Sequence, residues 1–78
     1  MSKSTKAEYN RLKVLLAEKK MTNKELADYL NVRPGTVSRW CTNDSQPAIE
    51  TFYRIAKFLD IDVRELLVPT KSKSFRYP

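Results

Sequence analysis

Apolar residues recur along this 78-residue chain at intervals of three and four, the spacing that places them on one face of a helix. Five segments show this pattern, with these inward-facing residues: Tyr9, Leu12, Leu15 and Leu16; Leu26, Ala27 and Leu30; Val37, Trp40 and Cys41; Ile49, Phe52, Ile55, Ala56 and Leu59; Val63, Leu66 and Leu67. No pair of segments alternates as the strands of a hairpin would. The pattern therefore predicts an all-α fold of five helices.

Capping signals place the ends of the first two helices. The stretches TKAE at 5–8 and TNKE at 22–25 both fit the capping box. In that motif the Thr side chain accepts a bond from the third helical amide and the Glu side chain bonds back. We therefore expect one helix over about residues 5–20 and a second over 23–30. The second should end at Asn31, because asparagine tolerates the left-handed conformation that often ends helices.

The stretch NVRPGTVSRW at residues 31–40 looks like an interruption, because Pro-Gly is a strong turn dipeptide. However, a residue before proline is biased toward extended angles, which are the angles that an N-cap residue adopts. Proline itself is favoured at the first helical position. Arg33 is thus predicted to cap, and Pro34 to open, a third helix that runs to about Thr42. Two short helices joined by a three-residue turn make a helix-turn-helix unit.

A polar loop follows, in which Asn43 is the expected left-handed terminator of the third helix. We expect a fourth helix over residues 48–59 and a short fifth helix that Asp62 caps. The chain then divides into three parts: a flexible arm at 1–5, a domain over 6–68 and a basic tail at 69–78.

Composition and charge narrow the class of protein. The chain has one cysteine and no histidine, so an internal disulfide is impossible and a His/Cys metal cluster is not expected. We expect no cofactor. There is no hydrophobic leader and no apolar run long enough to cross a membrane, which predicts a cytoplasmic protein. The net charge of +6 suits a nucleic-acid partner, although the basic residues concentrate at the two ends of the chain.

Four motifs together resemble the lambda-repressor and Cro-like helix-turn-helix family, the XRE-type regulators. They are TNKELA, NVRPGTVSRW, QP and IAKFLDIDVRELL, and the resemblance covers roughly residues 9–67. It implies a five-helix domain that binds double-stranded DNA in the major groove. It also implies a homodimer and a bacterial or phage origin.

The chain departs from the family pattern at three places. Lys20 stands where the family often has glycine, and Arg33 stands where a Ser or Thr cap is usual. The family often pairs an arginine in its first helix with a glutamate in its third, and these positions are Leu16 and Cys41 here. Replacing both partners of a buried ion pair by apolar groups is often neutral. We therefore predict that Leu16 lies near Cys41.

The outward face of the third helix carries the candidate DNA contacts. In helix-turn-helix proteins the N-terminal residues of the second helix of the motif meet base edges. The base-reading candidates are Arg33, Gly35, Thr36, Ser38 and Arg39. Arg39 should be the main one, because an arginine fork bonds guanine O6 and N7. The phosphate candidates are Asn23, Thr42, Asn43 and Ser45.

Several of these predicted DNA contacts have a simpler interpretation. Arg39 could be a solvated helix residue, and Arg33 could pair locally with Asp28 or Asp44. Trp40 could stack on a base, but its spacing from Val37 favours the core. The basic N-terminal arm could reach DNA or only be solvated.

Two functions remain open, and a third is disfavoured. The first is a sequence-specific transcriptional regulator, a repressor. The second is a protein-interaction module, such as an antitoxin or adaptor, which would hold a protein partner through the tail with Phe75 and Tyr77. Catalysis is disfavoured because the chain has no histidine, no glycine-rich phosphate loop and no clustered carboxylate pair.

Overall fold

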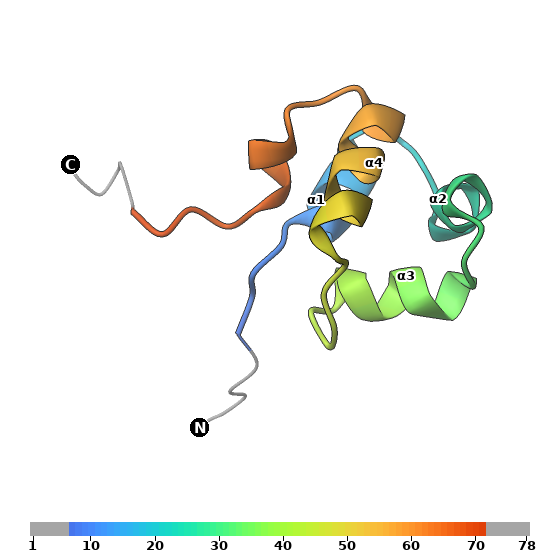
Figure 1. Cartoon of the computed structure of the whole chain (residues 1–78), viewed down its shortest axis with the longest axis horizontal. Helices are drawn as coiled ribbons and strands as arrows, with labels where there is room; N and C mark the ends of the chain where they lie inside the picture. The colour runs from blue at the N-terminus through green and yellow to red at the C-terminus, as the bar shows by residue number, and fades with distance from the viewer. Residues whose placement is uncertain (1–6, 72–78) are drawn as a thin grey trace.

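Four α-helices and one 3-10 helix make up the fold in the computed structural model, which describes residues 7–71 (Figure 1). They are α1 (Leu12–Glu18), α2 (Asn23–Leu30), α3 (Pro34–Cys41), α4 (Ile49–Leu59) and η1 (Val63–Leu66). The all-α prediction is confirmed. The fifth segment differs from the prediction because it is a single 3-10 turn, which Asp62 caps as expected. Within residues 7–71 no helix is long and apolar enough to cross a membrane.

The first helix begins later than predicted, at Leu12, and the predicted cap Thr5 lies outside the described residues. The backbone of residues 9–11 pairs with the end of the domain instead. The Arg11 N–H donates to Leu66 O at 2.8 Å, and the Val68 N–H donates to Tyr9 O at 2.9 Å. A backbone bonded to a distant segment in this way cannot also form helical bonds. Tyr9 is consequently 61% exposed, so its assignment to the core was wrong.

The helix-turn-helix unit has the predicted boundaries. The Thr22 side chain and Glu25 form the capping box of α2, and Asn31 ends that helix with a left-handed φ of 61°. Arg33 adopts extended angles, with a ψ of 146°, and Pro34 is the first residue of α3. Pro-Gly therefore begins a helix here, as the pre-proline bias predicted.

Two further residues assigned to the core lie at the surface. Ile49 is 69% exposed, because α4 begins at this residue and its inward face is formed by Phe52, Ile55 and the residues that follow at helical spacing. Leu67 is 43% exposed, because the chain becomes extended there (φ −106°, ψ 145°) and the helical spacing no longer applies.

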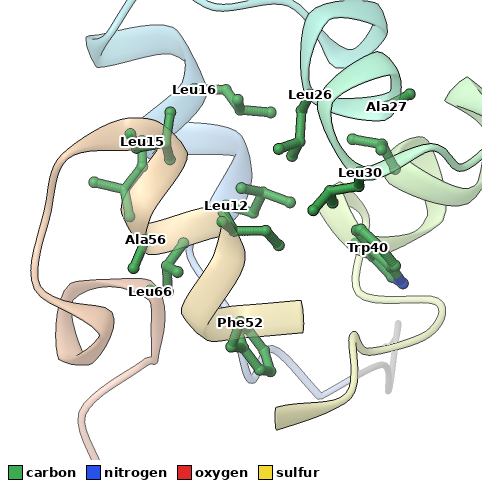
Figure 2. Close-up of a cluster of buried hydrophobic side chains, with 13 residues drawn as sticks. Leu12, Leu15, Leu16, Leu26, Ala27, Leu30, Trp40, Phe52, Ala56 and Leu66 are labelled. Carbon is green, nitrogen blue, oxygen red and sulfur yellow. The ribbon is translucent and has the colours of Figure 1, made fainter. Parts of the chain in front are cut away.

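The core lies between the four α-helices and η1 (Figure 2). The most deeply buried side chains come from every element: Leu12, Leu26, Val37, Ile55 and Leu66. Fully burying an aliphatic side chain of this size stabilises a fold by about 1.5–3 kcal/mol. Trp40 is also buried, so it is a core residue as predicted, and its position fixes which face of α3 is turned outward.

Candidate nucleic-acid interface

The outer face of α3 is the candidate interface. This helix lies along one edge of the molecule, with the turn from α2 at one end and the loop to α4 at the other (Figure 1). Val37 and Trp40 are buried and Cys41 packs against the core, so the exposed positions of α3 lie on its opposite, outward side. The structure leaves four of the five predicted base-reading residues exposed and one half-buried: Arg33, Gly35, Ser38 and Arg39 are exposed, and Thr36 is half-buried.

Both arginines of this face have guanidinium groups without an acidic partner among residues 7–71. Asp28, one of the two partners considered for Arg33, instead pairs with Lys24 at 3.2 Å. Residues 32–43 contain no acidic side chain. The exposed face of α3 is therefore positively charged, and its arginine forks remain available to acceptors outside the domain.

Gly35 leaves an unfilled space at the start of α3. It has a negative φ, so its backbone does not need glycine. A Cβ atom added there would meet nothing within 4 Å. No contact within the domain therefore explains why this residue lacks a side chain. A close approach of another molecule to the helix backbone would require such a residue.

Asn23 is half-buried at the first turn of α2, close to the end of α3. The Cys41 thiol donates to the Asn23 Oδ1 atom at 3.6 Å. Burial raises the pKa of the Cys41 thiol, and the positive charge of Lys13 opposes that rise. The thiol is thus protonated at neutral pH and able to donate. Cys41 and Leu16 line the same pocket, which confirms that they lie near each other.

Lys13 also belongs to this region, although it was not among the residues predicted to contact DNA. It lies on α1 and lines a pocket of about 380 Å³ together with Asn23, Ser38 and Thr42. Along the sequence it is only one polar position beside the apolar face of a helix. Its neighbourhood depends on how α1 packs against α2 and α3, which no local pattern reveals.

Three of the residues predicted to contact phosphates lie at the end of α3 and in the loop after it, and they differ in exposure and in hydrogen bonding. Ser45 is exposed. The Thr42 hydroxyl donates to the Asp44 carboxylate at 2.8 Å, which places a negative charge beside it. Asn43 is buried and has the predicted left-handed φ, here 63°. Its amide is used inside the domain, so we do not retain its side chain as a phosphate contact.

Asn43 belongs to a cluster of three side-chain amides, of which Asn10 and Asn43 are buried and Gln46 is half-buried. Its Oδ1 atom accepts from the backbone N–H groups of Tyr9 and Asn10 at 2.9 and 3.1 Å. The same atom accepts from the Gln46 side chain at 3.0 Å. Asn10 in turn donates its Nδ2 to Trp40 O at 3.0 Å and to Gln46 Oε1 at 2.7 Å. These bonds tie the end of α3 and its loop to the segment before α1.

The helix-turn-helix family model (HTH_3) matches residues 12–66, so the chain belongs to this family. Among solved structures, the chain is similar to a candidate DNA-binding protein from Bacteroides fragilis, with 44% identity and a TM-score of 0.75; the match covers 76% of this chain and 95% of that one. It is also similar to a transcriptional regulator from Listeria innocua, with 25% identity and a TM-score of 0.71, over 85% of this chain and 64% of that one. No curated protein sequence matches the chain.

Proposed function

We propose that this protein is a sequence-specific DNA-binding transcriptional regulator, a cytoplasmic repressor that places α3 in the major groove and performs no catalysis. The observation that carries the proposal is the exposed face of α3, where Arg33 and Arg39 have no acidic partner within residues 7–71. The family match and the two structural neighbours support it.

The residues of this face have different roles in the proposal. Arg39 bonds a guanine through its fork, and Arg33 takes a second guanine or a phosphate. Ser38 and Thr36 contact bases beside Arg39, and Gly35 lets the helix backbone approach the duplex. Asn23 and Ser45 contact phosphates on either side, with Thr42 weaker because of Asp44. Such phosphate contacts set the register of the helix on the duplex but carry no sequence information directly.

We further infer that two copies bind one operator with two-fold symmetry. Dimers of helix-turn-helix domains contact half-sites about 10 bp apart, so the operator should be a palindrome with this spacing. Leu67 and Val68 are the exposed apolar residues that favour a dimer contact on the side of η1.

The experiment selects tight-binding duplexes from a random pool and then compares wild type with Arg39→Ala on the selected site and its single-base variants. We expect Arg39→Ala to lose preference at one base position per half-site, by about 1–3 kcal/mol. Arg54→Ala is the matched control, because Arg54 is an exposed arginine of α4 placed over the Tyr29 ring. Unchanged base preference in Arg39→Ala would refute the assigned role, and a pool without enrichment would refute the function.

A further inference from the structure

A pocket of about 380 Å³ lies where α1, the first turn of α2 and the last turn of α3 meet. Its walls are largely apolar and include Leu16 and Cys41. Polar groups stand around them: Lys13 from α1, Asn23 from α2 and Ser38 from α3. None of the residues that line this pocket is acidic.

Three polar side chains of the pocket can donate hydrogen bonds to a ligand, whereas the Thr22 and Thr42 hydroxyls are engaged within the domain. Lys13 is exposed and makes no ion pair within residues 7–71. The bond from the Cys41 thiol occupies the amide oxygen of Asn23, which leaves the two N–H donors of that amide. Ser38 adds an exposed hydroxyl, which in this inference donates to a phosphate and not to a base. Three donors, one of them cationic, make a site for an anion, because no residue that lines the pocket is acidic and the neighbouring carboxylate, Asp44, is bonded to the Thr42 hydroxyl.

The position of the pocket indicates which anion it takes. Ser38 belongs both to the pocket and to the exposed face of α3. A duplex that lies against that face has its phosphate backbone beside the groove, and therefore over neighbouring elements of the domain. Lys13 and Cys41 line the same pocket, so the lysine side chain lies beside it.

We propose that this pocket binds one phosphate of the DNA backbone and that Lys13 is its cationic ligand. This inference rests on the proposed function, and it assigns DNA affinity to a residue outside the helix-turn-helix unit. Lys13 contributes affinity to every sequence equally, because a phosphate contact does not distinguish bases.

The first test is the salt dependence of binding to the selected duplex. Lys13→Gln should reduce the slope of log K against log salt concentration by about 0.9, the value for one lost phosphate contact. The matched control is Lys57→Gln, an exposed lysine in the last turn of α4, which lies away from α3 (Figure 1). The control should keep the wild-type slope. Equal melting temperatures of the three proteins check that the domain is intact.

The second test locates the phosphate. Single phosphates of the selected duplex are replaced one at a time by neutral methylphosphonates, and each duplex is titrated with wild type and Lys13→Gln. We expect one position per half-site at which the two changes are not additive, because each removes the same contact. At all other positions their effects should add.

The outcomes separate this inference from the function on which it rests. If wild type binds no duplex, both fail. If wild type binds a selected site but Lys13→Gln keeps the wild-type slope, Lys13 holds no phosphate and the inference is overturned while the function stands. A reduced slope with full additivity at every phosphate also overturns it, because the lysine would then act only through the general charge of the protein.

Discussion

At the scale of single residues, Gly35 is a position where the fold does not require glycine but a closely bound partner would. Its backbone angles suit any residue, and the space around its missing side chain is empty. Glycine lowers helix stability relative to alanine by roughly 0.5–1 kcal/mol. Gly35 therefore lowers the stability of the domain slightly, and no contact within the domain explains why glycine stands there. A closely approaching duplex would explain it.

Gly35→Ala tests that reason. We expect the free energy of unfolding to rise by up to about 1 kcal/mol, because alanine is the better helix former and its methyl group meets no atom of the domain. We expect affinity for the selected duplex to fall, because the methyl group would meet the DNA. Chemical denaturation and fluorescence anisotropy measure the two effects. A variant that is more stable and binds DNA as tightly as wild type would show that no close approach occurs there.

At the scale of elements, the end of α3 is held by side-chain amides. Asn43 supplies a left-handed conformation and one oxygen that accepts three hydrogen bonds, two of them from the backbone N–H groups of Tyr9 and Asn10. This arrangement anchors the segment before α1 to the loop after α3. It also explains why residues 9–11 are not helical, since their backbone bonds to Asn43 on one side and to residues 66–68 on the other.

Asn43→Gly distinguishes the two contributions of this residue. Glycine adopts the left-handed conformation at least as readily as asparagine, so the backbone geometry is kept. The N–H groups of Tyr9 and Asn10 lose their acceptor, and an unsatisfied buried donor costs about 1–3 kcal/mol. We expect a loss of unfolding free energy within this range in urea denaturation. A neutral or stabilised variant would mean that Asn43 contributes only its backbone angles.

At the scale of the whole molecule, two exposed apolar side chains follow η1, and Val68 lines a pocket together with Cys41 and Thr42 at the end of α3. Leu67 is 43% exposed and Val68 is 37% exposed, and both follow directly on the buried Leu66. Exposed apolar side chains on a small domain favour contact with another chain when they form a patch, and this segment is the one that we propose for the contact. A second copy that covers Leu67 would leave the outward residues of both α3 helices free for adjacent half-sites.

Leu67→Glu tests the proposed dimer. We expect sedimentation equilibrium to show a weaker dimer than wild type, because the carboxylate would have to be buried in the contact. The backbone bond between Leu67 N and Arg64 O does not involve the side chain, so the fold should persist. Ile49→Glu is the control, since Ile49 is 69% exposed on α4. Equal association of both variants and wild type would place the interface elsewhere.

Local signals in the sequence predicted most of the helix-turn-helix unit. The capping box at Thr22, the left-handed end at Asn31 and the opening of α3 at Pro34 depend only on neighbouring residues, and each was confirmed. The inward face of α3 also followed from spacing, which allowed Trp40 to be assigned to the core. The assignment of the remaining face to DNA stays a prediction, because it concerns a partner.

Tertiary structure decided the features that depend on distant segments. Residues 9–11 follow a helical pattern, but their backbone pairs with residues 66–68, so α1 begins at Leu12. Asn43 showed a turn signal in the sequence, whereas its role as an acceptor for the N-terminal segment required a contact across more than thirty positions. The sequence by itself determined the local geometry that turns α3 outward, since caps and spacing act within a few residues. Only tertiary structure brought Lys13 beside Asn23 and Ser38, because that pocket exists only where three separate helices meet.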